Sequence, residues 1–129
     1  MFLQTYFNHI KAEIDRYAAT RFVLEVEINF DSRPGDQGYL NGTIQFVDGS
    51  VLHFKEYVDA LNQNVDKLTY SYHFQDTGNQ LIFRYDNAAH KPRLSFVDHK
   101  HLAQQIISAP APLLENVLAE IFVLNGWTQ

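Results

Sequence analysis

The stretch "LTYSYHFQDTGNQLIFRYD", from Leu68 to Asp86, contains two runs of alternating apolar and polar residues around a polar turn. The turn residues, Asp76 to Asn79, predict the loop of a β-hairpin. With these four residues as the loop, one face of the hairpin is entirely aromatic or aliphatic, which indicates a core face. The expected cross-strand pairs on that face are Phe74 with Leu81, Tyr72 with Phe83, and Tyr70 with Tyr85.

The other face of this hairpin is polar, and it leads into "RYDNAAHKPRLSFVDHKH", residues 84–101. The same register places Ser71 opposite Arg84 and Thr69 opposite Asp86, and it places His73 beside Ile82. After the strand, we expect the chain to leave the sheet as a loop that carries three of the six histidines.

Two further segments predict antiparallel strands. In "RFVLEVEINF", residues 21–30, apolar residues alternate with polar ones, so one buried face is expected. A loop is expected to follow from Asp31, with Ser32, Pro34, Gly35 and Gly38. The apolar positions are Phe22, Leu24, Val26, Ile28 and Phe30.

Around Asp48-Gly49-Ser50, a three-residue loop would pair Phe46 with Leu52 and Ile44 with Phe54. A two-residue turn would instead pair Ile44 with His53 and Phe46 with Val51. The first register keeps the largest apolar groups on one face and is preferred. It places Glu56 at the rim of the same inward face, and residues 57–65 fit a short helix or a loop.

Helices are predicted at both ends of the chain. An apolar stripe at spacings of three and four residues covers roughly the first eighteen residues. Near the other end, Pro112 suits a helix start and Asn125-Gly126 suits a helix end. The predicted fold class is therefore α+β, an antiparallel sheet of five or six strands with the N- and C-terminal helices packed on one face.

The 129 residues, 46% of them hydrophobic, predict a single domain over residues 1–129. The absence of cysteine excludes disulfides, thiolate zinc sites and a cysteine nucleophile. The N-terminus lacks the pattern of a signal peptide, and no apolar run is long enough to span a membrane, so a cytoplasmic protein without membrane contact is expected.

The net charge of −5 argues against a protein that coats duplex nucleic acid. The charge is uneven, however. Residues 84–101 carry +2 without any histidine charge, which leaves −7 for the remainder of the chain. A locally basic site on an acidic body suits a local anionic ligand.

Several kinds of chemistry fit residues 84–101. His99 and His101 point the same way in an extended strand, so with His90 and Asp86 or Asp98 they could bind a divalent metal. Alternatively, histidines could transfer protons at neutral pH while Arg84 stabilises phosphoryl charge, which suits RNA cleavage through the 2′-hydroxyl. Arg84, Asp86 and Asn87 could also be mainly architectural, since such residues often end strands.

Three segments together resemble the TumE family, the toxin half of a bacterial type II toxin–antitoxin pair. They are "DGSVLHFKEYVD" (48–59), "LTYSYHFQDTGNQLIFRYDNAAHKP" (68–92) and "DHKH" (98–101). Two positions depart from the family's pattern: Ala89 stands where proline is usual, and Asp98 stands where a histidine is common. The resemblance implies a toxin and points to Glu56, His73, Arg84, Asp86, Asn87, His90, His99 and His101 as the site.

We therefore expect a toxin component that acts as a metal-independent ribonuclease without a cofactor. A non-enzymatic protein-interaction module and a metal-dependent hydrolase with a His/Asp site are the alternatives. The expected partners are a cognate antitoxin protein, RNA and a second copy of the chain in a homodimer. The expected catalytic residues are His90, His99, His101 and Arg84, the substrate-binding residues are Lys100 and His73, and the residues that orient them are Glu56, Asp86 and Asn87.

Overall fold

The computed structural model describes residues 2–62, 64–89 and 93–128, and its elements follow one another along a single antiparallel sheet. Neighbouring strands in the sheet are also neighbours in the sequence. In order, the elements are α1 (Leu3–Ala18), β1 (Val23–Arg33), β2 (Gln37–Phe46), β3 (Val51–Asp59), β4 (Asp66–Gln75), β5 (Leu81–Asp86), β6 (His99–His101), β7 (Ile106–Ser108) and α2 (Leu114–Asn125).

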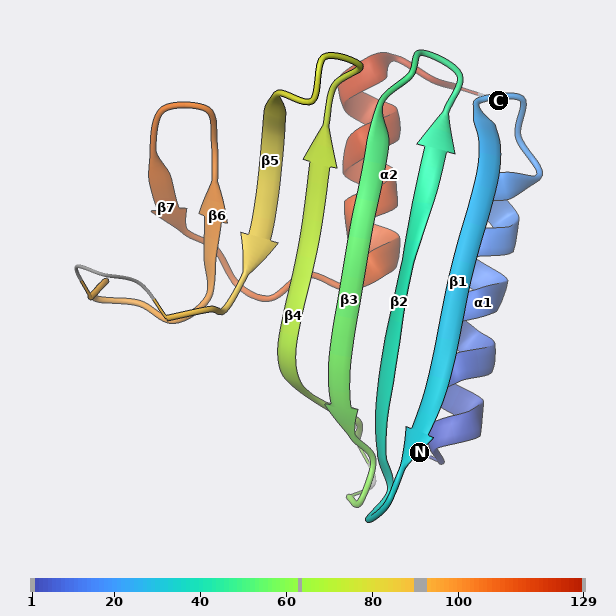
Figure 1. Cartoon of the computed structure of the whole chain (residues 1–129), viewed down its shortest axis with the longest axis vertical. Coiled ribbons are helices and arrows are strands. Elements are labelled where there is room, and N and C mark those ends of the chain that lie inside the picture. The colour runs from blue at the N-terminus through green and yellow to red at the C-terminus, as the bar shows by residue number, and fades with distance from the viewer. Residues whose placement is uncertain (1, 63, 90–92, 129) are drawn as a thin grey trace.

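Both helices lie behind the same face of the sheet, with α1 near β1 and α2 behind the central strands (Figure 1). The core lies between the helices and the sheet. The α+β prediction and the helix positions are confirmed, and Gly126 ends α2 in the left-handed conformation, with a φ of 66°. None of the helices among the described residues is long and apolar enough to cross a membrane.

The sheet has seven strands in the described part of the chain, slightly more than the predicted five or six. Residues 99–101, expected in a loop, form β6 and pair with β5. Residues 106–108 then form β7 and pair with β6. These strands are three residues long, too short for an alternating pattern to identify them.

The predicted hairpin registers are wrong by two residues. Ile44 lies opposite Leu52 rather than Phe54, because the loop tip is Val47–Gly49, one residue earlier than expected. Phe74 lies opposite Phe83 rather than Leu81, because the tip of that loop is 77–79 and a bulge follows Phe74. A shift of two residues keeps most side chains on their predicted faces. Leu81 is an exception, because the bulge pairs it with Gln75 rather than with a core residue, while Ile82 packs against the core.

A bulge also corrects one residue of β1. Leu24 was expected on the buried face, but its exposure is 66%. The register shifts between Val23 and Glu25, which turns Leu24 outward, while Val23 packs against the core. The strand itself continues to Arg33, past the expected loop start, and β3 occupies residues 57–59, which fitted a helix or a loop.

Candidate functional site

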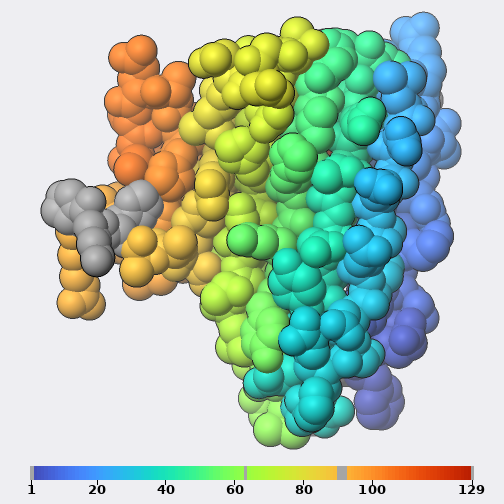
Figure 2. Space-filling view, in the orientation of Figure 1, coloured from blue at the N-terminus to red at the C-terminus, as the bar shows by residue number. Residues whose placement is uncertain are grey.

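The face of the sheet opposite the helices, called the open face, is turned toward the viewer in Figure 2, and it carries most of the described candidate residues. The register aligns them in two neighbouring rows that cross the strands. We call the first the His101 row; it contains Thr43, His53, His73, Arg84 and His101 on β2 to β6. The second, the Asp86 row, contains Asn41, Lys55, Ser71, Asp86 and His99 on the same strands.

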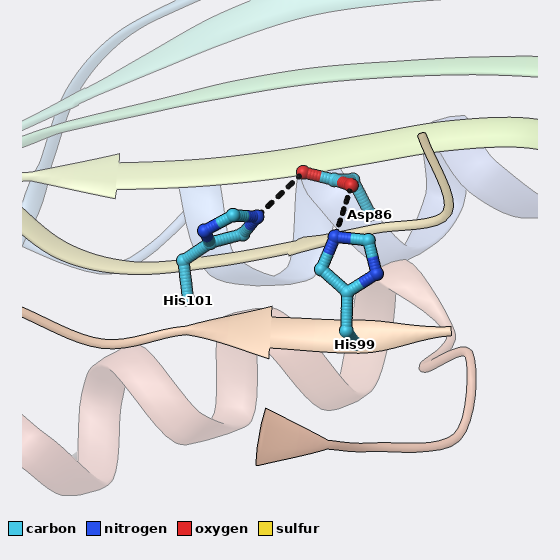
Figure 3. A group of neighbouring side chains, drawn as sticks. All are labelled: Asp86, His99 and His101. Atoms are coloured by element: carbon cyan, nitrogen blue, oxygen red, sulfur yellow. Dashed lines mark ion pairs between the residues drawn. The ribbon is translucent and has the colours of Figure 1, made fainter. Parts of the chain in front are cut away.

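Asp86, at the end of β5, is the centre of the site. Its carboxylate contacts His99 and His101 of β6 (Figure 3), and it also contacts Arg84 of its own strand. Oδ1 lies 2.7 Å from His99 Nε2 and accepts a hydrogen bond from the backbone N–H of Ala88 at 3.0 Å. Oδ2 lies 2.8 Å from Arg84 Nε and 3.5 Å from His101 Nε2. One buried carboxylate therefore holds a guanidinium and two imidazoles together.

His99 is buried completely, with 0% exposure, and both ring nitrogens face protein oxygens. Nδ1 lies 2.7 Å from the carbonyl oxygen of Val97, which can only accept, so Nδ1 carries a hydrogen. Nε2 lies 2.7 Å from Asp86 Oδ1, within hydrogen-bond distance. In this arrangement the ring positions Asp86 and is covered from a substrate.

His101 is the more accessible imidazole of the pair. Its side chain is 21% exposed, and its ring packs edge-on against that of His99 with the centroids 4.9 Å apart. His101 can therefore meet a ligand on the open face while it contacts the buried pair. The sequence pattern predicted the shared direction of these two histidines, and the structure adds the difference in their burial.

His73 lies directly opposite Arg84, in the position that the predicted register gave to Ile82. Burial and then the neighbouring Arg84 lower the pKa of His73, and the ring of His53 on β3 acts in the same direction. The two histidine rings have their centroids 6.1 Å apart. His53 was missed by sequence reasoning. Its alternation with Lys55 on β3 was the available signal, but only the correct register aligns it with His73.

Lys100 lies on the opposite face of the sheet from His99 and His101, because side chains alternate along β6. Its Nζ donates to Glu120 of α2 at 2.6 Å and lies over the ring of Tyr85. Burial lowers the pKa of Lys100, but the hydrogen bonds with Glu120 and Tyr85 more than offset that effect and raise it. The structure therefore does not bring Lys100 to the predicted site.

Glu56 is also on the helix side, fully buried rather than at a rim or beside the histidines. It accepts hydrogen bonds from the hydroxyls of Tyr6 and Tyr72 and lies 3.8 Å from Lys67 Nζ. Burial, followed by the nearby carboxylate, raises the pKa of both tyrosines. Glu56 thus belongs to a core network that is separate from the open face.

Asn87 completes the sheet where β5 ends. Its Oδ1 accepts from the backbone N–H of Tyr70 at 3.2 Å, and its Nδ2 donates to the carbonyl of Leu68 at 3.0 Å. The side-chain amide therefore continues the hydrogen-bond ladder to β4, which matches the architectural interpretation. Asp98 accepts from the hydroxyl of Tyr70 at 2.8 Å, and His90 lies outside the described residues.

The donor set of the site also fits a metal ion. One ligand atom from each of Asp86, His99 and His101 lies within 4.8 Å of the others. Two imidazoles and a carboxylate suit a divalent transition metal, and a hydrogen bond from the distal nitrogen, as His99 makes to Val97, is typical of ligating histidines. A second such group, His9, Glu13 and Glu115, lies on the helices.

Comparison with known families identifies the chain. A family model described as Toxin TumE matches residues 11–124. The chain belongs to the TumE toxin family. The match extends well beyond the 48–101 segment that carries the resemblance in sequence, and it includes both rows of the open face. No curated protein and no solved structure matches the chain.

Proposed function

We propose that this TumE-family protein is a toxin that cleaves RNA by metal-independent proton transfer on the open face. The observation that carries the proposal is the arrangement around Arg84, which has His73 directly opposite on β4 and His101 directly opposite on β6. Two imidazoles on either side of a guanidinium supply a base, an acid and a cation for one phosphate group.

In the proposed reaction, the RNA 2′-hydroxyl attacks the adjacent phosphorus and the bond to the 5′-oxygen breaks. His73 accepts the proton of the 2′-hydroxyl, because its lowered pKa keeps the ring neutral at pH 7. Arg84 balances the charge on the phosphoryl oxygens, and His101 donates a proton to the departing 5′-oxygen. The products are a 2′,3′-cyclic phosphate and a 5′-hydroxyl. Asp86 and His99 position Arg84 and His101.

A cognate antitoxin is the proposed partner of this surface. The open face carries Lys55 and Arg84 beside the histidines of the His101 row, so a partner that covers this row would block access to Arg84. Catalysis by His90, a homodimer and a cytoplasmic location stay predictions.

The test uses induced expression in bacteria and purified protein with single-stranded RNA. We expect His73→Ala and His101→Ala to relieve growth arrest and to lower the cleavage rate at least about 100-fold, since each removes a proton-transfer group. The acid limb of the rate-versus-pH profile is expected below about pH 6.5, the ordinary histidine value, because the pKa of His73 is lowered.

His9→Ala is the matched control, since His9 is exposed on α1, in the layer behind the sheet. It is expected to leave arrest, cleavage and the thermal melt unchanged. If His73→Ala and His101→Ala both stay fully toxic at an unchanged melting temperature, the proposed proton-transfer roles of these two histidines are refuted.

A metal-dependent hydrolase is the second candidate, and the close approach of Asp86, His99 and His101 favours it. Elemental analysis of protein purified without a histidine tag separates the two candidates. A stoichiometric transition metal, with cleavage that a chelator abolishes, would replace the metal-independent mechanism.

A further inference from the structure

A shallow groove of about 530 Å³ crosses the open face beside the group formed by Asp86, His99 and His101. It extends from β1 to β5, and Arg84 lines its end nearest to His101. The groove is therefore continuous with the candidate site. Its lining comes largely from the two rows of the open face: Glu27, Asn29, Tyr39, Asn41, Gly42, Thr43, His53, Phe54, Lys55, Ser71, His73, Gln75 and Arg84.

The two ends of the groove differ in chemistry. The end over β3 to β5 is cationic, with Lys55 and Arg84 beside two histidines. Lys55 is exposed and has no ion-pair partner among the residues that the structure describes. Arg84 Nε lies 2.8 Å from Asp86 but is not aligned for a hydrogen bond, and it is a buried donor without an acceptor in the described part of the chain.

The end over β1 and β2 is lined by amides and an aromatic ring. Asn29 Nδ2 donates to Asn41 Oδ1 at 3.1 Å, and Asn41 Nδ2 donates to the hydroxyl of Tyr39 at 3.4 Å. Side-chain amides are donors and acceptors that match the edge of a nucleobase, and a tyrosine ring offers a surface for base stacking. Glu27 adds an acceptor at this end.

This combination fits a single nucleotide unit better than a nucleic-acid duplex. The volume lies within the range of pockets that enclose a small molecule. A duplex binds along a broad basic surface, whereas the open face carries Glu25 and Glu27 on β1 and the whole chain has a net charge of −5. Single-stranded RNA presents free base edges together with phosphates, and the groove offers a partner for each.

We propose that this groove binds the nucleotide adjacent to the scissile phosphate of single-stranded RNA. The scissile phosphate lies at Arg84, the next phosphate lies at Lys55 and His53, and the base lies at Asn29, Asn41 and Tyr39. The assignment rests on the proposed RNA cleavage. It adds that the substrate is single-stranded RNA and that the strand lies along this groove. It also explains why histidines and amides continue across the sheet, well away from Asp86.

The experiment measures binding of a fluorescent single-stranded RNA oligonucleotide by anisotropy at two salt concentrations, with the same RNA in duplex form for comparison. The protein carries His101→Ala, so that binding is measured without cleavage. In that background, Lys55→Glu is expected to weaken single-strand binding on the order of tenfold and to reduce its salt dependence. His53→Ala is expected to weaken binding severalfold, and Asn41→Ala to change the preference among the four homopolymers.

Lys11→Glu is the matched control, because Lys11 is an exposed lysine on α1, in the layer behind the sheet. It makes the same charge change and is expected to leave binding unaltered. Equal losses from Lys55→Glu and Lys11→Glu, or tighter binding of the duplex than of the single strand, would overturn the groove assignment.

The outcomes also separate this inference from the proposed function. Lys55→Glu and His53→Ala can also be made in protein that retains His101, and RNA cleavage can be measured. Unchanged cleavage by these two variants would support the ribonuclease and refute the nucleotide-binding role of the groove. Binding that depends on Lys55 and His53, in a protein that cleaves no RNA, would preserve the groove and remove the ribonuclease.

Discussion

Asp86 is the residue on which the candidate site depends. Its carboxylate is almost fully buried, and the four groups around it come from β5, β6 and the backbone after β5. A buried carboxylate destabilises the fold if its cationic and hydrogen-bonding partners are removed. In the same way, the buried partners destabilise the fold if the carboxylate is removed. The interactions of the site therefore also help to hold β6 against β5, beside the backbone pairing of the two strands.

Asp86→Asn should lower the free energy of unfolding by about 3 kcal/mol, because it leaves Arg84 and the buried His99 without their carboxylate. Urea unfolding followed by the fluorescence of Trp127, the single tryptophan, measures the change. The control is Asp31→Asn, in an exposed ion pair with Arg33, for which a loss below about 1 kcal/mol is expected. Comparable losses in the two variants would contradict the central role of Asp86.

At the scale of elements, the strands are positioned by tight hairpins and by close contacts between backbones. Gly49 has a φ of 87° at the tip of the β2–β3 loop, and Asn79 takes the equivalent left-handed position, with a φ of 62°, in the β4–β5 loop. In the middle of β2, Gly42 lies so close to β1 that a Cβ atom would come within 2.3 Å of the carbonyl oxygen of Glu27. The ring of Phe54 fills the space beside this glycine.

Gly42→Ala should therefore destabilise the protein by about 2 kcal/mol or more, because the clash is with backbone that can move only if β1 and β2 separate. Thermal unfolding checks the value. Gly78→Ala, in an exposed loop where the added Cβ meets nothing closer than 3.4 Å, should be neutral or slightly stabilising. If Gly42→Ala is as stable as Gly78→Ala, then β1 and β2 can move apart far enough to accept the added Cβ atom.

At the scale of the whole molecule, the buried Glu56 network joins the helices to the sheet. Tyr6 reaches it from α1, while Lys67 donates to Tyr72 on β4 at 2.6 Å and to the carbonyl of Pro112 just before α2 at 2.7 Å. A register shift in β3–β4 turns Lys67 inward to this position, and burial lowers its pKa. The network lies on the helix side, so it supports the open face without contributing groups to it.

Tyr6→Phe should cost about 2 kcal/mol of stability, because the buried carboxylate of Glu56 loses a hydrogen-bond donor. The same substitution at Tyr17, on the same helix, should change stability by less than about 0.5 kcal/mol, since its hydroxyl makes no hydrogen bond among the described residues. Urea unfolding measures both variants. A Tyr6→Phe effect no larger than that of Tyr17→Phe would show that the network does not fasten α1.

Strand periodicity was sufficient to place some residues of this chain and insufficient for others. Alternation predicted the core faces of the hairpins and the shared direction of His99 and His101, because those depend only on the period of a strand. It failed for Leu24, for Leu81 and for the pairing of Arg84, where a bulge or a loop shifted by one residue changes the register. It also failed for Glu56, since nothing local distinguishes a buried acid with tyrosine donors from an exposed acid.

The sequence by itself therefore determined the α+β class, both helices, the core faces and the segment that holds the candidate site, because local periodicity and turn residues encode these features. Only the tertiary structure decided which residues meet. Antiparallel register brought His53, His73, Arg84 and His101 into one row across four strands, while alternation along β6 sent Lys100 to the opposite face. These contacts join residues far apart in the chain, and the physical reason is that their distances depend on loop lengths and bulges elsewhere in the sheet.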